Sequence, residues 1–81
     1  MTSAAIRTLG GRIYETAYDE CGTNPDDKTI REAGESAKAL TSGETHDVED
    51  GNSVWQHVYE PDEYDAAIEY AISIAHTDPE I

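Results

Sequence analysis

The chain has 81 residues, of which 18 are acidic and 5 are basic, and its formal net charge at pH 7 is -13. This length fits one small domain spanning 1–81, and it is too short for a cofactor-binding α/β enzyme. Cys21 is the only cysteine, which excludes an intrachain disulfide and indicates a reducing compartment, or at least a fold that does not need oxidation. No stretch approaches the roughly 18 apolar residues of a membrane helix, and the first residues lack a leader pattern, so we expect a soluble, cytoplasmic protein.

The acidic excess resembles the composition of haloarchaeal proteins, which carry few lysines and work in molar salt. Residues 39–81 hold eleven acids and no Lys or Arg. The acids are interleaved with apolar residues at helical spacing, which favours a folded chain over a disordered acidic tail. At low salt the negative charges repel one another, whereas molar salt shortens the Debye length to about 3 Å. We therefore expect a halophilic protein.

The first predicted element is an amphipathic helix over residues 4–21. Its apolar residues recur every three or four positions: Ile6, Leu9, Ile13 and Ala17. Gly10 and Gly11 each cost about 1 kcal/mol of helix propensity relative to alanine, so a kink there, or a start at Arg12, stays open. Gly22 is the predicted stop.

The second predicted helix covers residues 25–41, with Asn24 as its cap and Pro25 at its first position. Its apolar residues again follow helical spacing: Ile30, Ala33, Ala37 and Leu40. We expect it to end before Gly43.

The next segment allows two interpretations. In the first, residues 44–52 form an acidic loop and 53–60 form a short helix, in which Ser53 and Gln56 make a capping box. In the second, residues of about 45–60 form a β-hairpin that turns at Asp50-Gly51. The helix separates apolar from polar residues more cleanly, so it is our primary expectation.

Pro61 begins the most regular predicted helix, 61–76, which Asp78-Pro79 ends. Its apolar residues are Tyr64, Ala67, Ile68, Ala71, Ile72 and Ala75. The predicted fold is thus a mainly α bundle of three long helices and one short one. The alternative is an α+β fold with a hairpin, similar to a winged helix.

Residues 51–80 resemble a single tetratricopeptide repeat. The residues that carry the resemblance to its second helix are Tyr64, Ala67, Tyr70 and Pro79, and those that would occupy its first helix are Val54, Trp55 and Val58. Ile74 stands where the family has a small residue, Asp62 replaces the turn glycine, and 1–43 holds no second copy. The resemblance implies one antiparallel helical hairpin.

The sequence predicts no catalytic or cofactor-binding residues. No serine lies in a nucleophile elbow, and Cys21 ends an apolar stripe as a packed core residue would. In the hairpin interpretation, a turn centred on Gly51-Asn52 would place His46 opposite His57, which makes the two histidines weak metal candidates. Zinc-type spacing is absent, so we assign no metal and expect a protein that is not an enzyme.

Aromatic residues favour a role in binding other proteins. We predict that Trp55, Tyr59, Tyr64 and Tyr70 lie at or beside a contact surface, because Trp and Tyr combine apolar area with a polar group. The protein would act as a non-enzymatic interaction module or a small homo-oligomeric adaptor.

The alternative function is a DNA-binding regulator of helix-turn-helix or winged-helix type. Three cations of the second helix would contact phosphates: Lys28, Arg31 and Lys38. The acidic segment that would form the wing opposes this, because a phosphate backbone would repel it.

Overall fold

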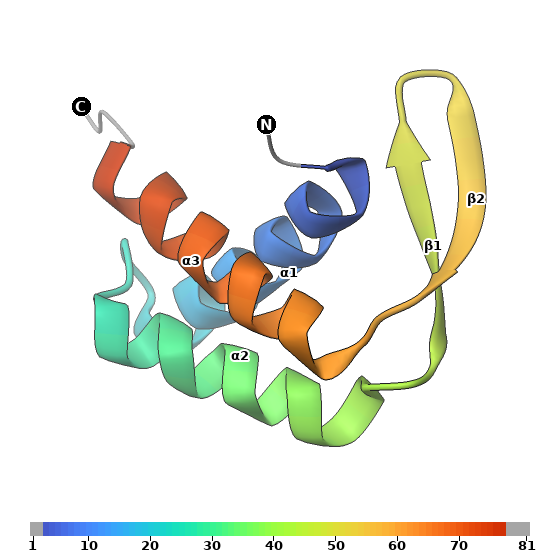
Figure 1. The fold of residues 1–81 in the computed structure, drawn as a ribbon. Helices are drawn as coiled ribbons and strands as arrows, with labels where there is room; N and C mark the ends of the chain where they lie inside the picture. Colours follow the sequence, from blue (N-terminus) through green and yellow to red (C-terminus); the bar gives the residue numbers. More distant parts are fainter. Residues whose placement is uncertain (1–2, 78–81) are drawn as a thin grey trace.

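The computed structural model describes residues 3–77 and shows three helices and one antiparallel β-hairpin (Figure 1). The order is α1 (Ala4–Cys21), α2 (Asp27–Thr41), β1 (Thr45–Asp50), β2 (Ser53–Val58) and α3 (Pro61–Thr77). The protein is therefore mainly α with a small hairpin, which agrees with the α+β alternative. The short helix predicted over 53–60 is wrong, because Ser53–Val58 form β2.

The turn of the hairpin explains why β1 and β2 meet in this register. Asp50 lies opposite Ser53, which leaves Gly51 and Asn52 as a two-residue turn. Gly51 has φ +61, a left-handed conformation that costs glycine little. Continuing along the strands, this register places His46 opposite His57, as the hairpin interpretation predicted.

Because β2 is a strand, the helical hairpin implied by the tetratricopeptide resemblance does not form. The residues assigned to its first helix, Val54, Trp55 and Val58, all lie in β2. Pro79, which the resemblance also used, lies outside the described residues. Only α3 agrees with a helix of the resemblance, and its bounds match the 61–76 predicted from the apolar spacing, with the last helical residue at Thr77.

α1 runs without a break through both glycines, so it does not start at Arg12. Ser3 caps its first turn by accepting a hydrogen bond from the Ile6 N–H at 3.2 Å. Gly22 ends the helix in a left-handed conformation with φ +73, as expected. Gly10 is needed for packing, because a Cβ there would lie 2.6 Å from Cδ2 of Tyr70 on α3.

α2 begins two residues later than predicted. Its cap is Asp26, whose carboxylate accepts a hydrogen bond from the Thr29 N–H at 2.9 Å, and this contact lowers the pKa of Asp26. Asn24 instead accepts a hydrogen bond from the Tyr14 hydroxyl at 2.6 Å and donates one to the Ala75 carbonyl at 3.1 Å. Asn24 therefore links α1 to the last turns of α3.

The core lies between the three helices and continues under the hairpin. Its buried hydrophobic residues are Ala5, Leu9, Ile13, Ala17, Ile30, Ala33, Val48, Tyr59, Tyr64, Ala67, Ile68, Ala71 and Ala75. Val48 is the residue by which β1 enters this core. Cys21, expected to pack in the core, is exposed at the end of α1.

Candidate interaction surface

The outer edge of β2 points its backbone groups into solvent. Asp47 of β1 lies opposite Gln56, and its carbonyl accepts a hydrogen bond from the Arg12 guanidinium of α1 at 2.9 Å. The Asp47 backbone therefore faces α1 and not β2. Opposed antiparallel residues point their backbone groups either toward each other or away from each other, in alternation. The backbone of Gln56 consequently faces outward, and so do those of Val54 and Val58.

The contact that follows the hairpin agrees with this alternation. The Gly43 N–H donates to the Tyr59 carbonyl at 3.0 Å, so the backbone of Tyr59 faces the chain that leads into β1. By the alternation along the strand, the backbones of Trp55 and His57 face β1 as well. Figure 1 shows β1 beside the helices and β2 on the far side of the hairpin. Within residues 3–77 the sheet has two strands, and no third strand pairs with this edge.

Exposed apolar side chains are concentrated on β2. Val54 is 62% exposed, Trp55 39% and Val58 44%, whereas the only other large exposed hydrophobics of the described residues are Tyr18 and Leu40. None of the six residues of β2 carries a formal charge, although the chain has a net charge of -13. Proteins usually protect an edge strand with lysine, proline or a bulge, and β2 contains neither lysine nor proline. Such an edge can pair with another strand.

The four aromatic residues predicted at the contact surface occupy different environments. Trp55 lies on β2. Tyr59 and Tyr64 have no exposed surface, and their rings pack edge to face with centroids 5.9 Å apart. The Tyr59 hydroxyl donates to the Ala5 carbonyl at 2.7 Å. Tyr70 is half-buried beside α1. Tyr59 and Tyr64 are core residues, so of these four it is Trp55 that belongs to the edge strand.

The two histidines considered for metal binding have separate roles in packing. Nε2 of His57 lies 2.9 and 3.1 Å from the two carboxylate oxygens of Glu63, which ties β2 to the first turn of α3. Nε2 of His46 is buried and has no hydrogen-bond partner among the described residues. Both rings pack against Tyr59. Residues 3–77 contain no group of three or more His, Cys, Asp or Glu side chains that could hold a metal ion.

The cations predicted to contact DNA are largely occupied by α3. Arg31 forms an ion pair with Glu69 at 3.1 Å, and Lys38 forms one with Asp65 at 3.3 Å. Hydrogen bonding to Asp65 also raises the pKa of Lys38. Lys28 is exposed at the start of α2. A phosphate approaching this face would meet the acids of α3 together with the cations.

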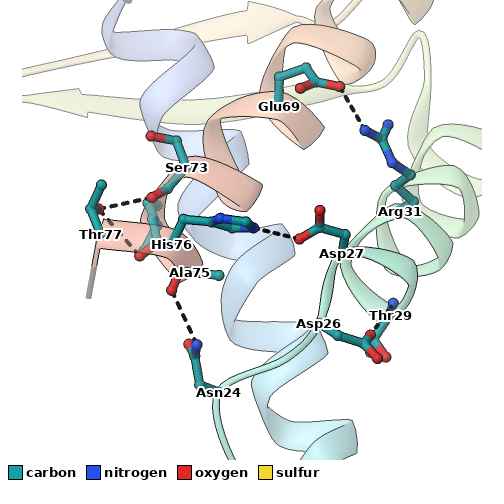
Figure 2. A network of polar contacts seen from close by, with 11 residues as sticks. Asn24, Asp26, Asp27, Thr29, Arg31, Glu69, Ser73, Ala75, His76 and Thr77 are labelled. Carbon is teal, nitrogen blue, oxygen red and sulfur yellow. Dashed lines mark hydrogen bonds and ion pairs between the residues drawn. The ribbon is translucent and has the colours of Figure 1, made fainter. Parts of the chain in front are cut away.

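Figure 2 shows how closely the start of α2 is joined to the end of α3. Nε2 of His76 lies 2.8 Å from the Asp27 carboxylate, next to the contact between Asn24 and the Ala75 carbonyl. The Arg31–Glu69 pair continues this line of contacts along the two helices. These contacts hold the helix pair together, and they leave the β2 edge on the hairpin uninvolved.

A cavity of about 540 Å³ lies between α1 and α2 and reaches β1 at His46. Its apolar lining includes Leu9, Ile13 and Leu40, but one cation and two acids also line it: Arg12, Glu20 and Glu32. This mixture of charges favours no single class of ligand. We therefore place the candidate site at β2, where backbone, side chains and charge agree.

Comparison with family models, curated proteins and solved structures gave no match for this chain. No helix within the described range is long and apolar enough to cross a membrane. The sequence allowed the strand β2 only as the alternative to a short helix, with Val54 and Val58 on one face after the Asp50-Gly51 turn. The cavity between α1 and α2 had no corresponding pattern in the sequence, because its position depends on which side of each helix α3 covers.

Proposed function

We propose that this protein is a non-enzymatic interaction module that binds another protein chain through the outer edge of β2. One observation carries the proposal: an uncharged strand presents three outward-facing backbones and exposed Val54, Trp55 and Val58 on an otherwise acidic molecule. In strand addition the backbone hydrogen bonds give affinity and the alternate side chains give specificity. The acidic composition supports a salt-rich cytoplasm as the place where it works.

The DNA-binding alternative has less support. Arg31 and Lys38 already pair with carboxylates of α3, and the hairpin carries no Lys or Arg that could contact a phosphate. Exposed ion pairs are worth about 0 to 1 kcal/mol, so a phosphate could displace them, but the released carboxylates would remain beside it.

The test is affinity capture with the tagged full-length chain from its native extract at native salt. Val58→Lys places a charge on the edge, whereas Leu40→Lys makes the same chemical change on α2, where the leucine is 73% exposed. We expect capture of the bound chain to be lost with Val58→Lys and retained with Leu40→Lys. Equal capture by both variants, or a wild-type protein that retains neither another protein nor its own copy, would contradict the proposed function.

A further inference from the structure

We infer that the chain bound at this edge is a second copy of the same protein, paired antiparallel through β2 about a two-fold axis at Gln56. The inference rests on the proposed interaction role and names its partner. It follows from three features of the described residues: the pairing register, the side chains on the two faces of the hairpin, and the position of the acids.

The register follows from the backbone directions. Two antiparallel strands form hydrogen bonds between residues whose backbones both face the shared gap. If Gln56 lies opposite its own copy, Val54 lies opposite the second copy's Val58, and all three outward-facing residues of each strand are paired. A shift by one residue would oppose outward to inward backbones, and a shift by two would leave one of the three residues beyond the strand.

The side chains suit the same register. On the outer face, each exposed valine meets the other valine of the second copy, and the Gln56 amide meets its own copy. On the inner face, Trp55 lies opposite the second copy's His57. That pair is not hydrogen-bonded through the backbone, and in such pairs the Cα atoms are only about 4.5 Å apart, so the side chains are close. The pairing thus brings each exposed apolar side chain of β2 against a side chain of the second copy.

The acids are placed so that this pairing avoids close like charges. Glu49 lies opposite Val54 and Asp47 opposite Gln56 on the outer face of each hairpin. Among the residues of β1 and β2, only the central row of the paired sheet has an acid from both copies, and those two Asp47 residues are separated by three strand spacings, about 14 Å. This exceeds the Debye length of about 8 Å at physiological ionic strength and greatly exceeds the value of about 3 Å at 1 M salt. The two copies still repel each other through their net charges of -13, and added salt screens this repulsion, so pairing should strengthen as salt increases.

The assembly also closes at two copies. Each chain contributes one open edge, that of β2, and the two-fold axis uses both. The opposite edge of the sheet is β1, which packs beside α1 and whose Asp47 carbonyl is occupied by Arg12. Within residues 3–77 a third chain would find no free strand edge to continue the sheet, so the proposal specifies a dimer and not a fibre.

Disulfide trapping tests the register directly. Cys21 is exposed and is first replaced by serine. Gln56→Cys then faces its own copy across a hydrogen-bonded pair, where a Cα separation of about 5.5 Å falls within the range for a disulfide. Val54→Cys alone lies four residues from its copy, about 14 Å, and is out of reach. A mixture of Val54→Cys and Val58→Cys should form a disulfide-linked heterodimer, whereas neither variant alone should form a disulfide-linked dimer.

Sedimentation velocity of the purified full-length protein measures the association itself. We expect a dimer whose dissociation constant falls as KCl rises, loss of the dimer in Val58→Lys, and a dimer in the matched control Leu40→Lys; circular dichroism checks that both variants fold. Efficient trapping by Val54→Cys alone, or a wild-type monomer at millimolar concentration in molar KCl, would overturn the inference. If that monomer still captured another protein in a manner sensitive to Val58→Lys, the proposed function would stand without the dimer; if capture also failed, both would fall.

Discussion

Gly34→Ala tests the closest approach of α2 to α3. Alanine is favoured over glycine in a helix by about 1 kcal/mol, so propensity alone would stabilise the variant. At Gly34, however, the new Cβ would lie 2.2 Å from Cγ1 and 2.5 Å from Cδ1 of Ile68. Ile68 is 3% exposed and has little space to move. Overpacking of this kind costs about 1 to 3 kcal/mol, so we expect a net loss of up to about 2 kcal/mol.

Gly11→Ala is the matched control, because it makes the same chemical change inside a helix where a Cβ would meet no atom within 4 Å. We expect it to stabilise the protein by about 1 kcal/mol. The propensity gain is common to both variants, so the difference between them measures the cost of the Ile68 contact. Ile68→Val removes the Cδ1 atom, so Gly34→Ala should cost less in that background than in the wild type.

The free energies come from urea unfolding followed by far-ultraviolet circular dichroism at one fixed KCl concentration. Urea is uncharged, so it leaves the screening of the acidic surface unchanged during the titration. If Gly34→Ala stabilised the protein as much as Gly11→Ala, α2 and α3 would not approach as closely as described. An equal penalty in the Ile68→Val background would place the cost at Cγ1, the nearest atom, which valine retains, and not at Cδ1.

Three further predictions concern burial, hydrogen bonding and salt. Burial raises the pKa of Tyr59 above its ordinary value of 10.0, so the protonated phenol stabilises the fold below about pH 10, and this contribution is lost as the pH rises through the raised pKa. Tyr59→Phe should lower the free energy of unfolding by about 1 kcal/mol at neutral pH, because the hydrogen bond to the Ala5 carbonyl is lost. Above pH 10 the stability of the variant should fall less steeply than that of the wild type, because phenylalanine cannot ionise. Equal slopes of the two proteins in urea unfolding at alkaline pH would count against this. Asn24→Ala should lower the free energy of unfolding by about 1 to 2 kcal/mol, because the Tyr14 hydroxyl and the Ala75 carbonyl each lose a partner; thermal melts that match the wild type would show that water replaces both bonds. The helical signal should rise with KCl toward the molar range, since the net charge of -13 makes repulsion the dominant electrostatic effect, and a full signal at low salt would assign the acidic excess another cause.

The helices were predictable because their apolar residues repeat at the period of the helix itself. The bounds of α1 agree with the prediction, and Gly22 ends it as its left-handed conformation requires. The start of α2 was misplaced because Asn24 and Asp26 are both good caps. Asn24 is engaged instead by Tyr14 and Ala75, which come from distant parts of the chain, and no local pattern reports those contacts.

The hairpin was harder to predict, because the apolar and polar residues of 53–60 separate more cleanly on a helix than on a strand. Contacts with residues outside this segment favour the strand over the helix. As a strand, β2 pairs with β1, which buries Val48, and it is followed by Tyr59, whose hydroxyl reaches the Ala5 carbonyl in the core. Burial also separates the aromatic residues of the core from the one on β2. Tyr59 and Tyr64 fill the core, and residue type alone does not distinguish a buried tyrosine from one at a contact surface.

The lack of charge on β2 is itself informative, because charge would have been easy to place there. Edge strands are usually protected by lysine, and both lysines of this chain lie on α2. Acids are abundant, and an aspartate or glutamate at Val54, Gln56 or Val58 would also have prevented pairing, in positions that are all exposed. The neighbouring strand β1 carries three acids in its six residues: Asp47, Glu49 and Asp50. A charged strand thus lies beside an uncharged one, and the uncharged one has the open edge. That arrangement is expected where another strand protects the edge by pairing with it.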